Sequence, residues 1–309
     1  MIAFKQVLCP IDFSETSRRA LTYAAAFASM YGAELEVLHV VPTFDDQLTT
    51  WWPNADACPP RLDAETGAAI TAEIHRAVAG AGAPGVHARA MVREGRAHEV
   101  IVGRAQVQPA DLIVMGTHGR SGVNRLLLGS VTEKVVRTAS CPVLTVPPGV
   151  HTSAGAPVSL GHILCPIDYS KSSLEALRWA VDLGRQANGV VTVLHALEYL
   201  SDALAEPSPF EPSGQAIAEH RARRQQIVEH ARAQLHAWAA QESTTQCTIH
   251  EVLAVDRAYK AILRHAEAMP ADLIVMGAQG ADGLELMLYG SNTQHVVRAA
   301  ACPVLTVRG

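Results

Sequence analysis

The sequence lacks an apolar run long enough to cross a membrane, which requires about 20 consecutive apolar residues. Residues 1–12 also lack the basic start, the apolar core and the small-residue cleavage site of a secretory signal peptide. We therefore expect a cytoplasmic protein without a membrane partner.

Cysteine is scarce, and its spacing is not that of a metal site. The six cysteines form no C-x-x-C pair and no Cys/His cluster with zinc-finger spacing. Cys9 and Cys165 recur at matching places, as do Cys141 and Cys302, and we interpret all four as small buried hydrophobic residues. The pattern excludes a zinc finger and indicates a reducing compartment.

The chain has no excess of positive charge. Its formal net charge is −5 and no long basic run is present, so nucleic acid is not an expected partner. A Walker P-loop, a nucleophile elbow and a protein-kinase signature are absent as well. The sequence offers no residue that we would nominate as a general base, and it predicts no dedicated catalytic machinery.

The sequence contains enough apolar residues to form two hydrophobic cores. Of its 309 residues, 49% are hydrophobic and 18% charged, which is typical of a globular protein. A chain of this length is too long for one ordinary doubly wound domain and suits two domains of about 150 residues.

An internal repeat divides the chain in half. Three segments recur, VLCPIDFS at 7–14 and ILCPIDYS at 163–170, ADLIVMG at 110–116 and 271–277, and CPVLTV at 141–146 and 302–307. The period is far longer than a solenoid unit, so each copy is predicted to be a whole domain. We expect domains at 1–148 and 161–309, joined by a linker at 149–160.

Within each copy, short β-branched apolar runs alternate with helical patterns. The first copy predicts strands at 7–11, 35–41, 86–92, 112–115 and 143–146, and helices at 15–31, 63–80, 97–106 and 131–138. Continuous apolar strands are typical of parallel sheets that are buried on both faces. The alternation predicts an α/β fold with a doubly wound parallel sheet in each domain.

Irregular segments follow the second strand of each copy, at 44–60 and 201–213. They are predicted to be surface loops or lids. Trp51 and Trp52 in the first are open to three interpretations, a ligand cover, an interface patch or a loop that packs on its own domain.

A spaced glycine motif follows the fourth strand of each copy. Two residues separate Gly116 from Gly119, nine more separate Gly119 from Gly129, and Ser130 follows; the same spacing recurs at Gly277, Gly280, Gly290 and Ser291. Glycine allows positive φ and close approach of a ligand to the backbone, which suits polyphosphate. The alternative interpretation is that the glycines serve only tight turns, but a double occurrence after the same strand sequence favours ligand binding.

The serines of this motif predict two helix starts. Ser130 with Glu133, and Ser291 with Gln294, have the spacing of capping boxes, which would place a helix N-terminus behind the glycine. Such an N-terminus attracts anions. The alternative is that both serines only cap their helices.

On these residues, the chain resembles the universal stress protein family, in its ATP-binding branch. The resemblance also covers the segment from Asp12 to Leu21 and the Leu38-His39-Val40 run, which Leu194-His195-Ala196 matches. It implies two five-stranded parallel sheets of strand order 3-2-1-4-5, a fold of the adenine nucleotide alpha hydrolase type. Ligands of such sheets bind at the switch point, here between strands one and four.

The resemblance also implies the residues that bind nucleotide. In the first domain these would be Pro10, Ile11, Asp12, Val40, Met115, Gly116, His118, Gly119, Arg120, Gly129, Ser130, Val131 and Thr132. Asp12 would accept a hydrogen bond from the base or ribose, although it could instead cap the first helix. The residues from Gly119 onward would hold phosphates through N–H and hydroxyl groups.

The second domain carries the same frame with different side chains. Its counterparts are Pro166, Ile167, Asp168, Ala196, Met276, Gly277, Gly280, Gly290, Ser291, Asn292 and Thr293. Between the glycines, the first copy has His118, Arg120 and Arg125, whereas the second has Asp282 and Glu285. Arginine binds phosphate and a carboxylate repels it, so we expect ATP, with its magnesium, mainly in the first domain. If these side chains point to solvent, both sites would fill.

These expectations favour a stress-response protein whose regulatory module binds ATP and is read by a protein partner that the sequence does not identify. The alternatives are a slow ATP hydrolase, and a scaffold or carrier of a non-nucleotide ligand with vestigial loops. His39 and His195 are interpreted as satisfied core residues. Members of the family pair along strand five. By this resemblance, the two domains would pair with each other inside the chain and cover two exposed sheet edges. A further homodimer is possible as well.

Overall fold

The computed structural model describes residues 4–43, 62–82, 85–119, 128–150, 158–198, 214–242, 247–278 and 290–309. Contacts between Cα atoms divide the chain into two compact units, Met1–Val158 and Ser159–Gly309. The segments around Trp51 and Trp52 and at 201–213 lie outside the described residues.

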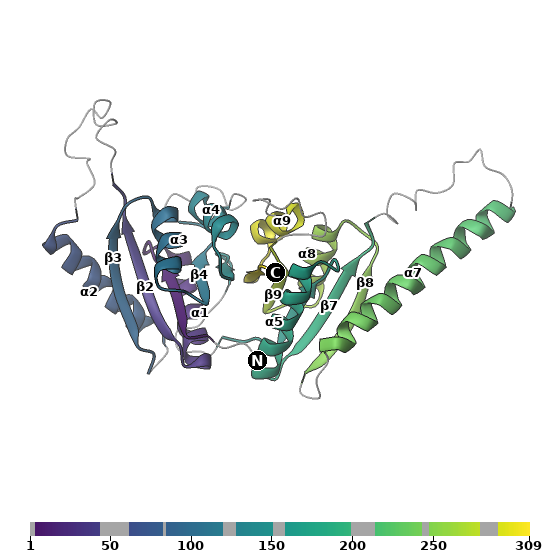
Figure 1. Cartoon of the computed structure of the whole chain (residues 1–309), viewed down its shortest axis with the longest axis horizontal. Coiled ribbons are helices and arrows are strands. Elements are labelled where there is room, and N and C mark those ends of the chain that lie inside the picture. The colour runs from purple at the N-terminus through teal and green to yellow at the C-terminus, as the bar shows by residue number, and fades with distance from the viewer. Residues whose placement is uncertain are drawn as a thin grey trace, which may run out of the picture. The chain divides into compact units, whose positions relative to one another are not determined.

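The first unit alternates strands and helices. Its elements are β1 (Gln6–Pro10), α1 (Glu15–Tyr31), β2 (Glu34–Val41), α2 (Ala64–Gly80), β3 (Ala88–Glu94), α3 (Ala97–Val107), β4 (Leu112–Gly116), α4 (Ser130–Thr138) and β5 (Val143–Val146) (Figure 1). The strands are parallel and their order is β3-β2-β1-β4-β5. The predicted fold class and strand order are confirmed.

The second unit repeats this architecture. Its elements are β6 (His162–Pro166), α5 (Lys171–Ala187), β7 (Val190–Ala196), α7 (Gly214–Glu242), β8 (Thr248–Ala254), α8 (Ala258–Ala268), β9 (Leu273–Gly277), α9 (Ser291–Ala299) and β10 (Val304–Val307). Counted from its own first strand, the order is again 3-2-1-4-5, as β8-β7-β6-β9-β10. The main difference is the length of α7, which has 29 residues where α2 has 17.

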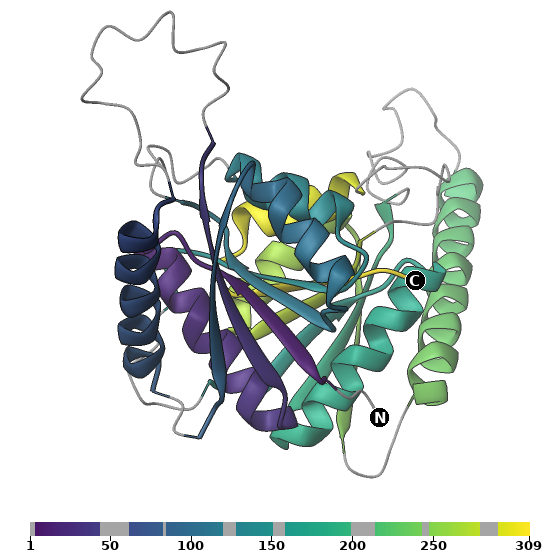
Figure 2. The ribbon, with the colours of Figure 1, turned by 60° about the vertical axis from the view of Figure 1, so that its left-hand side comes forward.

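Helices cover both faces of each sheet. In the first unit, α1 packs beside α2 and α3 packs beside α4, on opposite sides of the strands (Figure 2). The central strands β1 and β4 are buried along their whole length, as the apolar runs from Val7 and from Leu112 predict. Because β1 and β4 are parallel neighbours, their carboxyl ends lie side by side. The loops that follow these two strands surround this end of the sheet.

The edge strand β3 begins and ends two residues later than predicted. Arg93 and Glu94 continue its pairing with Val40 and Val41 of β2. An edge strand leaves such polar side chains in water, so hydrophobicity does not mark its end.

The aspartate of the repeated ADLIVMG segment has a structural role in both units. The Asp111 carboxylate accepts hydrogen bonds from the backbone N–H groups of Lys5 and Gln6, at 2.6 and 2.9 Å. Asp272 likewise accepts from the N–H of His162, at 3.0 Å. In both units the aspartate before strand four holds the start of strand one, which is a structural role.

Candidate functional site

A pocket of about 310 Å³ lies at the carboxyl ends of β1, β2 and β4 in the first unit. It is lined by Pro10, Ile11, Asp12, Ser17, Leu38, Val40, Ala97, Ile101, Met115, Gly116, His118, Gly119, Gly129, Ser130, Val131 and Thr132. All predicted site residues of this unit are present except Arg120, which lies outside the described residues together with Arg125. The structure thus gathers four separate parts of the sequence around one space.

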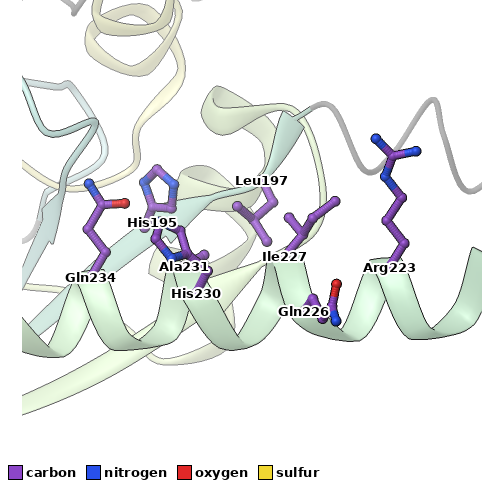
Figure 3. Close-up of a pocket in the computed structure, with 8 residues that line it drawn as sticks. All are labelled: His195, Leu197, Arg223, Gln226, Ile227, His230, Ala231 and Gln234. Carbon is purple, nitrogen blue, oxygen red and sulfur yellow. The ribbon is translucent and has the colours of Figure 1, made fainter.

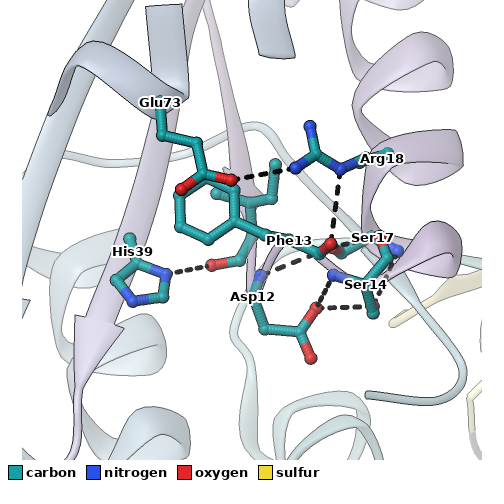
Figure 4. A network of polar contacts seen from close by, with 8 residues as sticks. Asp12, Phe13, Ser14, Ser17, Arg18, His39 and Glu73 are labelled. Carbon is teal, nitrogen blue, oxygen red and sulfur yellow. Dashed lines mark hydrogen bonds and ion pairs between the residues drawn. The ribbon is translucent and has the colours of Figure 1, made fainter. Parts of the chain in front are cut away.

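Asp12 is held in place by the turn into α1. Its Oδ1 accepts hydrogen bonds from the backbone N–H and the hydroxyl of Ser14, at 3.0 and 2.5 Å, and its own N–H donates to Ser17 (Figure 4). The N-cap of α1 is Ser14, whose side chain accepts from the N–H of Ser17. The alternative in which Asp12 caps this helix is therefore wrong, because Asp12 lies two residues before the N-cap.

The residue after Asp12 adopts a backbone conformation that large side chains rarely take. Phe13 has φ 65°, and its ring lies 4.8 Å from that of His39, centroid to centroid, while the Arg18 guanidinium lies 5.6 Å from its centre (Figure 4). Arg18 also pairs with Glu73 of α2 at 3.0 Å. These contacts hold a turn of left-handed conformation, and the turn directs Asp12 into the pocket.

The glycines of the motif are required by close packing. A Cβ on Gly119 would lie 2.7 Å from Oδ2 of Asp12, and a Cβ on Gly116 would lie 3.0 Å from the backbone of Thr16. Gly116, Gly119 and Gly129 are absent from the described glycines with positive φ. The sequence offers two reasons for glycine at these positions, close approach to the backbone and positive φ. The structure shows the close approach, and it does not show the positive φ.

The helix behind the glycines starts one residue earlier than the capping-box interpretation requires. Gly129 is the N-cap of α4, Ser130 is its first helical residue, and no side chain caps it. The N–H of Gly129 donates to the carbonyl of Thr117 at 2.8 Å, which holds Gly129 outside the helix. The prediction of capping boxes at Ser130 and Ser291 is wrong, since Gly290 caps α9 in the same way.

Ser130 is consequently available for a ligand. It lines the pocket at the N-terminus of α4, where the first backbone N–H groups have no partner within the helix. Thr132 is different, because its hydroxyl donates to the carbonyl of Gly116 at 2.8 Å. Thr132 can therefore offer its N–H to an anion, but its hydroxyl proton is already used.

His118 closes one side of the pocket. Its Nδ1 lies 2.8 Å from the Thr117 hydroxyl, and its carbonyl accepts from the hydroxyl of Thr16 at 2.6 Å. Its Nε2 is shielded from solvent and has no hydrogen-bond partner in the described part of the chain. A ligand with a polar group could satisfy this nitrogen.

Sequence reasoning missed one wall of the pocket. Ala97 and Ile101 of α3 line it, although nothing in the glycine motif points to them. The available signal was Gly95, which has φ 146° and lets the chain turn sharply from β3 into α3. The second unit has Asp256 at this place.

The second unit reproduces the backbone frame of the site. Oδ1 of Asp168 accepts from the N–H of Ser170 at 3.0 Å, and the Thr293 hydroxyl donates to the carbonyl of Gly277 at 2.9 Å. A Cβ on Gly277 would lie 2.7 Å from the hydroxyl oxygen of Ser172. The predicted residues within this frame are Pro166, Ile167, Asp168, Ala196, Met276, Gly277, Gly290, Ser291, Asn292 and Thr293, at the same places as in the first unit. Gly280, Asp282 and Glu285 lie outside the described residues.

The remaining polar candidates have structural surroundings. His39 and His195 are half-buried, and each Nδ1 bonds the carbonyl at the end of strand one, at 2.7 and 2.9 Å. Cys9 and Cys165 are fully buried, and this burial raises the pKa of both thiols. Cys141 and Cys302 are only partly buried.

The described residues contain neither a metal-binding cluster nor a membrane-spanning helix. No group of three or more His, Cys, Asp or Glu side chains is placed to hold a metal ion. Among the same residues, no helix combines the length and apolar character of a membrane span.

Comparison with known proteins gives one consistent result. The sequence profile of the Universal stress protein family matches residues 3–147 and again 160–308. A universal stress protein of Thermus aquaticus is 39% identical over 143 residues, which cover 46% of this chain and 98% of that protein. A universal stress protein of Mycolicibacterium smegmatis is 26% identical over 312 residues, covering 98% of this chain and 96% of the relative.

Solved structures show the same fold over the whole chain. The crystal structure of a universal stress protein from Archaeoglobus fulgidus has a TM-score of 0.63 at 23% identity, and the match covers 98% of both chains. A universal stress protein structure from Pseudomonas aeruginosa has a TM-score of 0.60 at 18% identity and covers 99% of this chain and 94% of its own.

Proposed function

Because this chain belongs to the universal stress protein family, we propose that it is a stress-response regulator whose first unit binds ATP in the pocket between β1, β4 and α4. The observation that carries the proposal is the meeting, in one pocket, of the Asp12 carboxylate with the N-terminus of α4. One end of the space offers an acceptor and the other offers N–H donors.

The walls of the pocket suit the parts of a nucleotide. Ile11, Val40 and Ile101 provide apolar surface for a flat base. Asp12 accepts a hydrogen bond from the base or ribose. The N–H groups of Ser130, Val131 and Thr132 face phosphate at a helix N-terminus, where negative charge is stabilised. Magnesium would arrive with the phosphates and keep mostly water and phosphate oxygens as ligands.

We propose unequal use of the two units, with ATP mainly in the first. The proposal rests on sequence, since Arg120 and Arg125 have no basic counterparts in the second copy. A cytoplasmic location, an unidentified protein partner and pairing of the units through their fifth strands belong to the same proposal.

The test is the nucleotide content of two matched variants. Aspartate is a favoured N-cap residue, so Gly129→Asp and Gly290→Asp each preserve helix capping while adding a negative charge beside the phosphate position. A Cβ on Gly129 would lie 3.1 Å from the carbonyl oxygen of Thr117, so circular dichroism and thermal unfolding check that this variant is folded. We expect Gly129→Asp to weaken ATP binding at least about a hundred-fold, because like charges at close range cost several kcal/mol. We expect Gly290→Asp to change it little.

The measurements are mass spectrometry of nucleotide released from the denatured protein, and calorimetric titration with magnesium-ATP. About one ATP per chain that is lost only in Gly129→Asp would support the proposal. Two per chain would overturn the asymmetry. No binding in the unaltered protein would favour a scaffold or a carrier of another ligand, and steady ATP turnover that Gly129→Asp abolishes would favour a slow hydrolase.

A further inference from the structure

A second cavity lies on the opposite face of the second sheet from its nucleotide frame. It has a volume of about 430 Å³ and is lined by His195, Leu197, Arg223, Gln226, Ile227, His230, Ala231 and Gln234 (Figure 3). Neighbouring strand residues point to opposite faces, so His195 faces this cavity while Ala196 faces the nucleotide frame. We call the cavity the α7 groove.

The groove exists because one face of α7 changes character along its length. In the carboxyl-terminal half, Ala231, Leu235 and Ala239 are buried, and Trp238 meets the Tyr169 ring edge to face at 5.2 Å. Burial against this half raises the pKa of Tyr169 to about 12. This part of the helix is packed as a core helix is packed.

One or two turns earlier, the same face is polar. Arg223, Ile227, His230 and Gln234 are spaced by four, three and four residues, which keeps them on one side of the helix, and Gln226 lies four residues before His230 on the same side. In Figure 3, Ile227 lies beside Leu197, and Arg223 and Gln234 stand at the two ends of the row. Ile227 is 43% exposed, although this face looks toward the sheet.

The lining indicates the chemistry of an occupant. It contains an arginine, two histidines and two glutamines, and no carboxylate among the described lining residues. No ion pair of Arg223 occurs within the described part of the chain. The Nδ1 of His195 faces the carbonyl of Ile167 at 2.9 Å, which makes Nδ1 the donor and leaves Nε2 for a ligand.

The groove is long as well as cationic. Gln234 lies eleven positions after Arg223, which corresponds to about 16 Å of helix. Leu197, Ile227 and Ala231 form an apolar strip between the polar ends. We propose that the α7 groove binds an elongated small organic anion, whose acidic group meets Arg223 and whose apolar body lies on Ile227 and Leu197.

The test uses 8-anilinonaphthalene-1-sulfonate, an organic anion with an apolar body that fluoresces when bound, on the full chain. Two matched pairs of variants separate the groove from general charge. Arg223→Glu alters the groove, and Arg224→Glu makes the same change on the neighbouring exposed residue. Gln226→Glu and Gln225→Glu form the second pair, because only Gln226 lines the groove.

We expect saturable binding of the probe that Arg223→Glu weakens about ten-fold and Gln226→Glu several-fold, with less than two-fold effects in Arg224→Glu and Gln225→Glu. Saturating magnesium-ATP should not displace the probe, which distinguishes this site from the nucleotide pocket. Binding that is not saturable, or that both arginine variants weaken equally, would overturn the proposal. All four substitutions are on exposed helix positions, and circular dichroism checks that each variant is folded.

Discussion

At the scale of single residues, the two units differ in a buried pair of polar residues, one on the second strand and one on the helix that follows the third strand. In the first unit, Glu36 is 2% exposed, and the Nε and Nη2 of Arg104 donate to its two oxygens at 2.5 and 2.6 Å. In the second unit, Thr192 and His265 occupy these places by the repeat of the sequence. The first unit thus has a buried ion pair at a place where the second unit, with the same strand order, has a threonine and a histidine.

This exchange predicts a rescue. Arg104→Met leaves the Glu36 carboxylate buried without its partner, which should lower the free energy of unfolding of the first unit by about 3 kcal/mol. Adding Glu36→Thr removes the unpaired charge and introduces the residue that the second unit has at this place, so it should restore most of the loss. Urea unfolding of the single and double variants measures both. If the double variant were no more stable than the single one, the buried charge would not be the cause.

His265 predicts a pH dependence of the second unit. Burial, followed by the nearby His162, lowers the pKa of His265, and its Nε2 is shielded without a hydrogen-bond partner among the described residues. The unfolded chain therefore binds a proton more readily than the folded unit, so stability is lost as pH falls below about 6.5, the ordinary histidine value. His265→Gln should flatten this part of the profile. Urea unfolding of both proteins at pH 7.5 and 5.5 checks it, and parallel profiles would contradict it.

At the scale of helices, two serines near the candidate site have opposite roles that their sequence patterns do not distinguish. Ser14 caps α1 with its side chain, whereas Ser130 is the first residue of α4 and caps nothing. We expect Ser14→Ala to cost about 1 kcal/mol of stability. Ser130→Ala should change stability by less than about 0.5 kcal/mol and weaken ATP binding instead. Thermal unfolding and calorimetric titration separate the two effects, and an equal loss of stability in both variants would contradict this assignment.

The sequence predicts elements well and their ends less well, for a physical reason. The α1 helix runs from Glu15 to Tyr31 as expected, because a local cap precedes it and the left-handed Gly32 follows it. The start of α4 depends instead on a bond between Gly129 and Thr117, twelve residues away, and no local pattern records such a contact. The left-handed Phe13 was unforeseen for the same reason, since its partners His39 and Arg18 come from other elements.

The same division applies to the candidate site. Residues that follow strands one and four are predictable, because the carboxyl ends of adjacent parallel strands meet. The wall from α3 was not predicted, since it requires the packing of a helix across the sheet to be known. The α7 groove was missed because its polar stripe reads, in sequence, as an ordinary solvated helix face.

At the scale of the whole chain, duplication makes each unit a domain with its own core and with a fifth strand that ends its own strand order. β5 ends the strand order of the first unit, and its residues are buried and, apart from Thr145, apolar. An apolar edge strand of this kind pairs with another strand when one is available. If the fifth strands of the two units pair within the chain, residues 1–158 produced alone lose that partner and should form a symmetric dimer.

Light scattering of this fragment and of the full chain measures the effect. We expect a dimer of the fragment, and weakening of that dimer by Thr145→Lys, which places a charge on the buried strand. Magnesium-ATP titration of the same fragment checks that the nucleotide pocket, all of whose described residues lie before residue 133, is intact. A fragment that binds ATP and remains monomeric at high concentration would argue against pairing through the fifth strand while leaving the proposed nucleotide site untouched.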